Sequence, residues 1–409
     1  MRIGAKLQDK LDLGLLLPSI FLIVFGLLAI YSSTINHPTA QGNFDRQFFW
    51  FFLSLAALLI AYFIPPHVYR IIAIPAYIFS LATLVLVLLM GKTVYGSKSW
   101  LGVGTLGMQP SEFAKIGVIL FLSYWISRKQ TDINSVKDLA IILGIGFLPI
   151  ALIMMQPDTG TAIVFALLTL FMLFWGGISL FGLFVVLSPG VVMFASVFGT
   201  LPMFIALGLI LLLLIYFKRD LFVSATVFVV NIAAAFFFDY LYHILQPHQQ
   251  KRIETFLDPN ADPLGAGYNA LQAKVAIGSG GLVGKGFLEG NQTQLRFIPE
   301  QWTDFIYCVV GEEFGFIGSV IVIILFLLIF TRLLKLASVA RDHFSSLVVM
   351  GVLVLLFIHF AINIGMNVGV TPVIGLPLPF LSYGGSSLIA NMTLIGIALN
   401  IHKNRKRYD

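Results

Sequence analysis

Long apolar segments alternate with short polar segments along almost the whole chain. Twelve of them are roughly 20 residues long, the length that an α-helix needs to cross a bilayer. They cover residues 13–33, 46–64, 70–90, 110–127, 138–155, 159–176, 179–198, 201–217, 221–242, 304–331, 344–369 and 384–402. In lipid a spanning segment must satisfy its own backbone polar groups, which a helix does. The pattern predicts an all-α, polytopic integral membrane protein with about twelve transmembrane helices.

A long polar interval, residues 243–303, precedes the last three predicted helices. Neither this interval nor the polar segment 91–110 is long enough for an independent globular domain, so we predict one membrane domain over residues 1–409. The least regular apolar segment is 201–217, where Pro202 and the short length also allow a re-entrant or tilted segment.

The distribution of charge predicts the orientation. Charged residues make up only 11% of the chain, and the net charge is +6. Most Lys and Arg residues in the predicted loops fall on one side, for example Arg128, Lys129 and Lys137. An excess of basic residues marks the cytoplasmic side. We therefore expect both termini in the cytoplasm and residues 243–303 outside it, and the positive charge needs no nucleic acid to explain it.

Metal and disulfide chemistry have little support in the composition. Cys308 is the only cysteine, which excludes an internal disulfide framework and a cysteine-built metal site. The seven histidines show no metal-ligand spacing. A divalent cation, Mg²⁺ or Mn²⁺, held loosely on substrate phosphates stays open.

An acidic residue, Asp304, stands where the tenth predicted helix begins. A carboxylate in a membrane segment costs roughly 2.5–3.5 kcal/mol at the bilayer centre and less near the interface. Such a residue is retained when it has a function, and Asp304 is the candidate catalytic residue.

The start of the fourth predicted helix carries a polar cluster: Gln109, Ser111, Glu112 and Lys115. Glu112 and Lys115 are three residues apart and therefore share a helix face. One interpretation is a structural ion pair inside the membrane. The other is a cation held in a cavity to meet an anionic lipid headgroup, with phosphate as the natural partner of lysine.

Three further charged residues are candidates on the same side. Asp158 stands at a tight turn between two helices, where a helix cap and a site role are equally compatible with the sequence. Arg46 begins the second predicted helix and is either an interface anchor or a ligand in the same cavity as Lys115. Lys274, on an amphipathic stretch from 266 to 277, could reach a headgroup or be merely solvated.

Two segments have unusual backbone requirements. Residues 278–286 are glycine-rich but fail the phosphate-loop pattern, because Lys285 is followed by Gly286, and we expect these glycines to allow sharp turns and close packing. Residues 371–387 contain three prolines and cannot form a continuous helix. Non-helical backbone at membrane depth is buried in protein or lines a wet cavity. In the second case Ser382, Tyr383 and Ser386 would supply hydroxyl groups.

Together these motifs resemble one family, the SEDS (shape, elongation, division, sporulation) proteins, over nearly the whole chain. The motifs that carry the resemblance, in family order, are Gln109–Glu112, Gln156–Asp158, Asp262–Tyr268, Ala276–Gly281, Pro299–Phe305 and Gly375–Ser386. The residue pattern of the long polar interval resembles the elongation members of the family more than the division members.

The resemblance implies a peptidoglycan glycosyltransferase whose substrate is lipid II, a disaccharide-pentapeptide on undecaprenyl pyrophosphate. The essential acid of the family falls on Asp304, and Glu300 of the same motif becomes a candidate for substrate binding. A class B penicillin-binding protein as transpeptidase partner, and other membrane proteins of the elongation machinery, are also implied.

The sequence departs from the family in three places. The family usually has ten membrane helices, and the two surplus helices predicted here would lie between residues 178 and 242. Arg296 stands where the family carries an acid. Ser99 stands where an arginine often precedes Trp100, and Lys98 is the nearest substitute.

For the glycosyltransferase that the resemblance implies, we expect inverting glycosyl transfer with Asp304 as the general base. The main rival is a flippase that moves lipid II without chemistry, since many spans and broken helices suit transporters too. The polar groups gather on the outer face without a matching inner set, which favours the enzyme.

Overall fold

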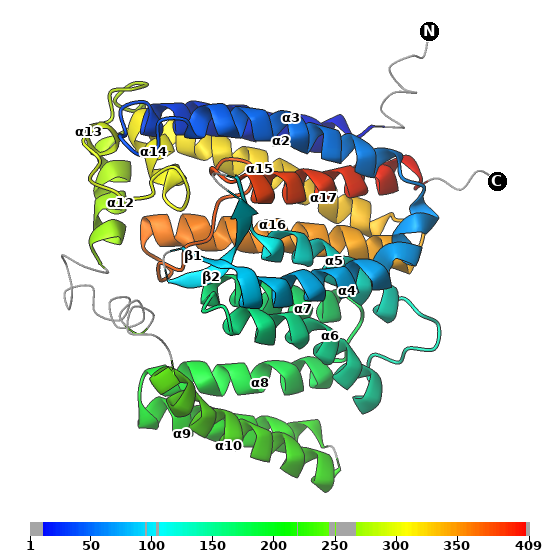
Figure 1. Cartoon of the computed structure of the whole chain (residues 1–409). Helices are drawn as coiled ribbons and strands as arrows, with labels where there is room; N and C mark the ends of the chain where they lie inside the picture. The colour runs from blue at the N-terminus through cyan, green and yellow to red at the C-terminus, as the bar shows by residue number, and fades with distance from the viewer. Residues whose placement is uncertain are drawn as a thin grey trace.

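Long helices lying side by side make up most of the molecule, as the computed structural model in Figure 1 shows. The structure describes residues 11–94, 96–103, 106–218, 220–244, 250 and 267–405. The long helices are α2 (Leu13–Thr34), α3 (Asn43–Phe63), α4 (Pro66–Met90), α5 (Pro110–Ile126), α6 (Val136–Met154), α7 (Thr159–Trp175), α8 (Leu180–Val197), α9 (Thr200–Phe217), α10 (Leu221–Ile244), α15 (Gly315–Ser338), α16 (His343–Val368) and α17 (Gly385–Lys403). Three shorter helices are α12 (Tyr268–Ser279), α13 (Asn291–Gln294) and α14 (Ile306–Glu313).

Every predicted membrane segment overlaps one of the long helices. Within the described residues, nine helices are long and apolar enough to cross a membrane, and two shorter apolar stretches are α7 and the Leu221–Phe236 part of α10. The uncertain segment 201–217 forms one continuous helix, α9, because Pro202 lies in its first turn, where no intrahelical donor is lost. The polytopic, mainly helical membrane architecture is confirmed, and the number of crossings stays a prediction.

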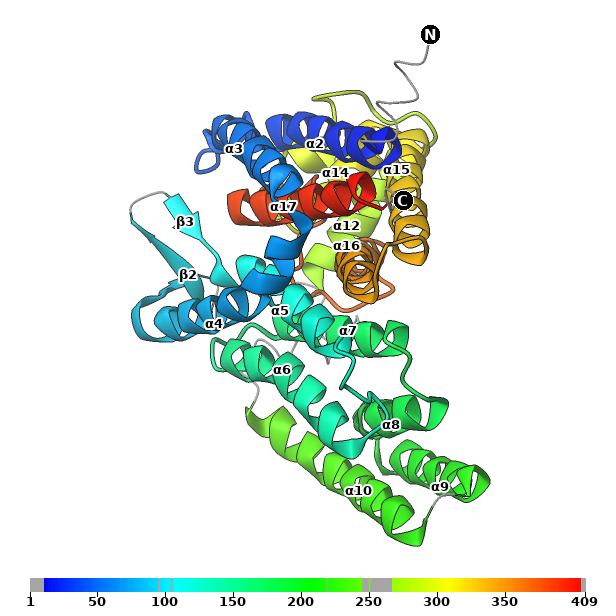
Figure 2. The same ribbon diagram turned by 90° about the vertical axis from the view of Figure 1, so that its right-hand side faces the viewer.

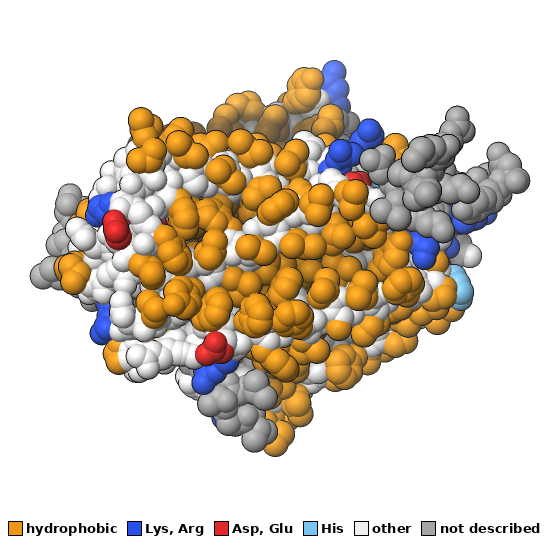
Figure 3. Space-filling view, turned by 90° about the horizontal axis from the view of Figure 1, so that it is seen from above, with side chains coloured by type: hydrophobic (Ala, Val, Ile, Leu, Met, Phe, Trp, Pro, Cys, Tyr) orange, Lys and Arg blue, Asp and Glu red, His pale blue; other side chains and the backbone are white. Residues whose placement is uncertain are grey.

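The bundle is organised around α16 and α17. The most apolar part is 67% buried in α16 and 78% buried in α17, against 28% for α3 and α4, which lie at the outside. Viewed from above in Figure 3, the surface is covered with apolar side chains, and charged groups lie toward its edges. An apolar outer surface around a helical interior is what a lipid environment requires.

Helices α8, α9 and α10 form a separate group at one side of the bundle (Figures 1 and 2). They enclose a small core of their own that includes Val192, Ile210 and Leu214. Within this group the buried side chain of Asn231 donates to Ser188 Oγ at 2.9 Å. Interhelical hydrogen bonds of this kind hold helices together in lipid, where no hydrophobic driving force acts between them.

The predicted single helix over 304–331 is wrong. Residues 301–305 form turns, α14 follows, and the chain breaks at Phe314 before α15. The glycine-rich segment supplies the missing partners: Lys285 N donates to Glu312 O at 2.9 Å, and Phe316 N donates to Gly281 O at 2.9 Å. The backbone groups at the break between α14 and α15 are therefore hydrogen-bonded although the helix is interrupted. The hydropathy pattern does not reveal this interruption.

A small antiparallel sheet was also not predicted. It consists of β1 (Lys92–Val94), β2 (Ser97–Val103) and β3 (Leu106–Met108), in that order. Two of the strands have only three residues, too few to produce an alternating pattern. The sheet is fixed to the bundle because Ser97 Oγ and Lys98 N both donate to Gln156 O.

The start of α2 and the end of α17 lie on the same side of the bundle (Figure 1). His402 Nδ1 of α17 is 3.6 Å from Asp12 Oδ2, which caps α2. If both helix ends lie on the same side of the membrane, the chain crosses the membrane an even number of times from α2 to α17.

Gly315 offers a test of the break. Its φ of +66° is strained for other residues, and an added methyl group would overlap the backbone of Gly284 and Leu282. We expect Gly315→Ala to cost at least about 1–3 kcal/mol, the usual cost of such strain, and to lower the thermal unfolding midpoint in detergent. Gly144→Ala is the control, because nothing lies within 4 Å of its added methyl group. Equal midpoints for the two variants would contradict this account of the break.

Candidate active site

A cavity of about 690 Å³ opens at the end of the bundle where α5, α7 and α17 begin. Its wall comes from the turn before α14, the non-helical segment before α17, the small sheet and the start of α3. The predicted site residues that line it are Arg46, Gln109, Asp158, Glu300, Asp304, Tyr383 and Ser386. Ser111, Glu112, Lys115, Lys274 and Ser382 are not among the lining residues.

Asp304 is half-buried in the turn that precedes α14, not inside a membrane helix. Its backbone carbonyl accepts from Asn363 Nδ2 at 2.9 Å and from Asn367 Nδ2 at 3.1 Å, both on α16. Gly375 makes room for the carboxylate, because a methyl group there would lie 3.2 Å from Asp304 Oδ2. A fully buried pair of amides thus holds the backbone of the candidate base from behind.

The non-helical segment 369–384 is bonded directly to this turn. Ser382 Oγ donates to Thr303 O at 2.6 Å and accepts from Leu378 N at 2.8 Å. Tyr383 N donates to Trp302 O at 2.9 Å. The hydroxyl group of Ser382 is thus committed to structure, whereas Tyr383, Ser386 and Ser387 line the cavity.

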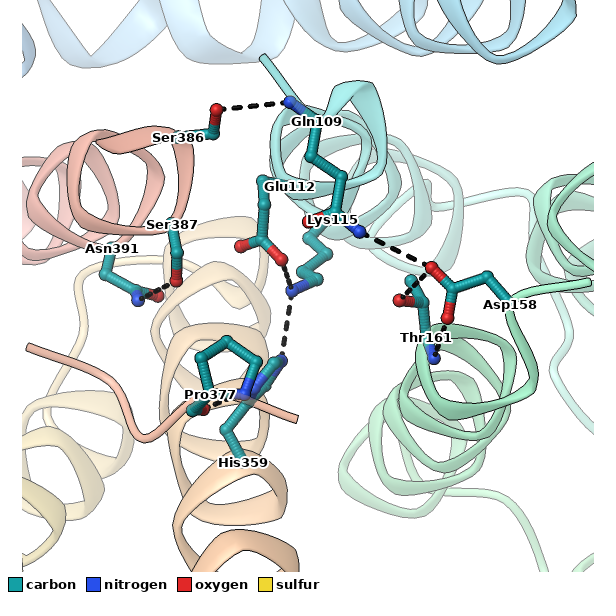
Figure 4. A network of polar contacts seen from close by, with 10 residues as sticks. All are labelled: Gln109, Glu112, Lys115, Asp158, Thr161, His359, Pro377, Ser386, Ser387 and Asn391. Atoms are coloured by element: carbon teal, nitrogen blue, oxygen red, sulfur yellow. Dashed lines mark hydrogen bonds and ion pairs between the residues drawn. The ribbon is translucent and has the colours of Figure 1, made fainter. Parts of the chain in front are cut away.

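Gln109 and Asp158 connect three helix starts at the rim of the cavity (Figure 4). Gln109 N donates to Ser386 Oγ at 3.1 Å, and Gln109 Nε2 donates to Asp158 Oδ2 at 3.4 Å. Asp158 also caps α7 through Thr161 N, as the capping interpretation predicted. Desolvation raises the pKa of Asp158, and its hydrogen bonds to Thr161 oppose that shift. Asp158 both caps a helix and faces the cavity.

Lys115 lies behind this rim in a buried cluster (Figure 4). Its ammonium group donates to Glu112 Oε1 at 2.6 Å and lies 3.0 Å from His359 Nε2. His359 Nδ1 is 3.2 Å from Pro377 O, so a proton on Nδ1 leaves Nε2 to accept from Lys115. The predicted ion pair is present, and it supports the wall formed by Pro377. His359 was missed, because a single histidine in an apolar helix has no local signal.

The cations divide into those at the cavity and those committed elsewhere. Arg46 and Lys92 are exposed and line the cavity, and Lys92 on β1 was missed by the sequence analysis. Lys98 Nζ donates to Leu88 O at 2.7 Å at the end of α4, and Lys98 is not among the residues that line the cavity. The side-chain end of Lys274 lies against Gly369 at the C-terminus of α16, where a positive charge is favourable.

The long polar interval is described only in part. The amphipathic stretch predicted over 266–277 corresponds to α12, and Asn269 of that helix reaches the cavity wall. Most of the motif 262–268 lies outside the described residues.

These features define a class of protein: a polytopic helical membrane protein with a cavity at one end of its bundle that broken helices wall and charged side chains line in part. The sequence model of the family described as Cell cycle protein, which groups FtsW, RodA and SpoVE, matches residues 14–198 and 178–407. The chain belongs to this family.

Individual relatives match over nearly their full length. The chain is 36% identical to the peptidoglycan glycosyltransferase MrdB of Escherichia coli K12, over 97% of this chain and 95% of that protein. It is 34% identical to the peptidoglycan glycosyltransferase RodA of Treponema pallidum, over 96% of this chain and 97% of that protein. A chain from a solved peptidoglycan synthase complex that coordinates polymerization and crosslinking superimposes with a TM-score of 0.73, at 28% identity, covering 97% of this chain and 98% of that one.

The amide pair behind Asp304 can be tested by Asn363→Leu. This change removes the donor to the carbonyls of Asp304 and Leu376. We expect a loss of stability of about 1–3 kcal/mol, the cost of buried groups left unsatisfied, seen as a lower unfolding midpoint in detergent. Asn391→Leu is the control, since the Asn391 amide donates to Ser387 Oγ and not to the Asp304 turn. An unchanged midpoint for Asn363→Leu would contradict a supporting role.

Proposed function

We propose that this protein is a peptidoglycan glycosyltransferase that polymerises lipid II into glycan strands during cell elongation. The observation that carries the proposal is the Asp304 carboxylate at a cavity whose rim also holds Arg46 and Lys92. Family membership supports it, because relatives named peptidoglycan glycosyltransferase match almost the entire chain. A carboxylate beside cations is the combination that a sugar-transfer reaction with an anionic leaving group requires.

The proposed reaction is a single inverting displacement. The hydroxyl oxygen of the acceptor sugar forms a bond to the anomeric carbon of the donor, and the bond from that carbon to the pyrophosphate oxygen breaks. Asp304 accepts the hydroxyl proton as a general base. Undecaprenyl pyrophosphate leaves as a stable anion, so it needs charge stabilisation rather than a second carboxylic acid.

Arg46 and Lys92 are the proposed partners of the pyrophosphate. Both are exposed at the cavity, whereas the charge of Lys115 is engaged by Glu112 behind the wall. Gln109, Asp158, Glu300, Tyr383 and Ser386 offer hydrogen-bonding groups for the sugars and peptide. Ser111 is buried near the start of α5, and like Glu112 and Lys115 it would support the cavity wall without touching the substrate.

A Mg²⁺ or Mn²⁺ ion would bind mainly to pyrophosphate oxygens. Within the described part of the chain, no three His, Cys, Asp or Glu residues are grouped closely enough to hold a metal ion. Mg²⁺ commonly keeps its waters and binds through substrate phosphates and one or two carboxylates. Asp304, Asp158 and Glu300 are the cavity carboxylates that such an ion would meet.

The charge distribution supports an orientation in which the cavity faces outward from the cytoplasmic membrane. Basic residues concentrate at the opposite end of the bundle, which the positive-inside rule assigns to the cytoplasm. A class B penicillin-binding protein that crosslinks the product is the proposed partner, because a chain of similar structure comes from a complex of polymerization and crosslinking.

The alternative of a flippase without chemistry has less support. The names of the relatives describe a transferase. A transporter would also need no base at the cavity, whereas Asp304 is held there by two buried amides.

Asp304→Asn tests the general base. We expect it to reduce glycan polymerisation by at least about 100-fold, within the range that general base catalysis contributes, while its unfolding midpoint stays near that of wild type. Polymerisation of purified lipid II with and without the partner transpeptidase measures this. Asp45→Asn is the matched control, an exposed aspartate on α3 that does not line the cavity. Normal glycan chains from Asp304→Asn would refute the assignment.

Lys92→Gln tests the cation that sequence analysis missed. We expect polymerisation to fall about fivefold at low ionic strength, since two opposite unit charges about 4 Å apart in water attract with roughly 1 kcal/mol. The loss should shrink at high salt because the remaining attraction is screened. Lys129→Gln, exposed at the opposite end of the bundle, should behave as wild type. Equal rates for both variants would exclude Lys92 from the site.

A further inference from the structure

A second cavity, of about 640 Å³, lies at the end of the bundle opposite the Asp304 cavity. It is lined by the first residues of α4 and α16 and by the last residues of α17, whereas the Asp304 cavity is reached from the other ends of these helices. Helix α4 has 25 residues, and at about 1.5 Å per residue the two cavities are separated by the thickness of a bilayer core. The reaction proposed above does not use this second cavity.

Positive charge predominates in the second cavity. Arg70 and Arg341 line it, and Asp342 is the one acidic residue among the described lining residues. The Asp342 carboxylate already accepts from Ser345 N and from Ser345 Oγ, both at 3.1 Å, where it caps α16. It therefore neutralises at most one of the two guanidinium groups.

The guanidinium group of Arg70 is held in position from two sides. It lies 3.5 Å from Asp342 Oδ1 and 5.1 Å from the ring centre of Phe344. Arginine presents five N–H donors in a planar fork, so a single carboxylate contact leaves donors for a second anion. Its side chain is 51% exposed, and those donors are accessible.

The same cavity has an apolar side that opens toward lipid. Ile71 and Ile74 of α4 line it and are 67% and 40% exposed. A soluble anion would gain nothing from these side chains, whereas the acyl chain of a lipid would pack along them. Cations at the membrane interface above an apolar strip match the headgroup and first methylenes of an anionic phospholipid.

We propose that this cavity binds the phosphate group of an anionic phospholipid, with Arg70 and Arg341 as its ligands. The lipid would connect α4, α16 and α17 at the end of the bundle away from the Asp304 cavity. The proposal concerns phosphate recognition and does not depend on the glycosyltransferase function.

The experiment uses the full chain in nanodiscs of phosphatidylcholine with and without phosphatidylglycerol. Bound lipid retained in native mass spectra and the thermal unfolding midpoint are measured. We expect wild type to retain phosphatidylglycerol and to gain stability from it. Retention should fall roughly fivefold for each arginine replaced by glutamine, the equivalent of about 1 kcal/mol per charge.

The variants are Arg341→Gln alone and Arg70→Gln combined with Arg341→Gln. Arg341 is exposed, so its single variant keeps the test valid if the loss of Arg70 disturbs the packing of Phe344. Lys335→Gln is the matched control, an exposed cation in the last turn of α15 that does not line the cavity. Retention of phosphatidylglycerol by Arg341→Gln and by the double variant at the wild-type level would overturn the proposal.

Inorganic phosphate and glycerol phosphate, added to protein in pure phosphatidylcholine, distinguish the source of the phosphate. If either one stabilises wild type as strongly as phosphatidylglycerol does, and the double variant loses that effect, the site takes a soluble phosphate and the lipid assignment fails. Stabilisation by phosphatidylglycerol alone supports the lipid.

Discussion

Backbone polar groups that leave a helix inside a membrane protein must be bonded to the protein itself, and the site depends on how this chain meets that requirement. The turn at residues 301–305 and the segment 369–384 are both non-helical. Asn363, Asn367 and Ser382 donate to the backbone of the first, and the two segments bond each other. Because these partners come from α16 and from the segment before α17, the position of Asp304 is set by the centre of the bundle.

The glycine-rich segment 278–286 meets the same requirement on the other side of α14. It bonds the backbone at the break between α14 and α15, where Gly315 takes a conformation that other residues rarely adopt. The buried Glu312 carboxylate reinforces this packing, since it pairs with Lys285 at 3.0 Å and accepts from Thr293 N at 2.9 Å. Helix α14 is therefore fixed at both ends, and the turn that carries Asp304 has little freedom to move.

The cations near the Asp304 cavity differ in how deeply they are buried. The buried Lys115 is neutralised by Glu112 and adjoins His359, and together they stiffen the wall at Pro377. Arg46 and Lys92 are exposed at the surface of the Asp304 cavity. A buried charge is expensive unless it is paired, whereas an exposed one is available to a ligand, so the depth of each cation decides what it can do. At the opposite end of the bundle Arg70 and Arg341 are also exposed, although Arg70 is paired with Asp342.

The sequence by itself determined the membrane class, the family and all the long helical segments except 304–331, which the structure divides between a turn, α14 and α15, because apolar length and ordered local motifs are properties of the chain alone. It also marked Asp304, and it predicted the cap at Asp158 and the pair of Glu112 with Lys115, which depend on neighbours three residues apart. Only the tertiary structure decided that Lys92 lines the cavity and Lys98 does not, that Ser382 is structural, and that Asn363, Asn367 and His359 support the site. These assignments depend on contacts between residues as many as 335 positions apart, such as the bond from Gln47 to Ser382. No local pattern records such distances, because the packing of helices in three dimensions sets them.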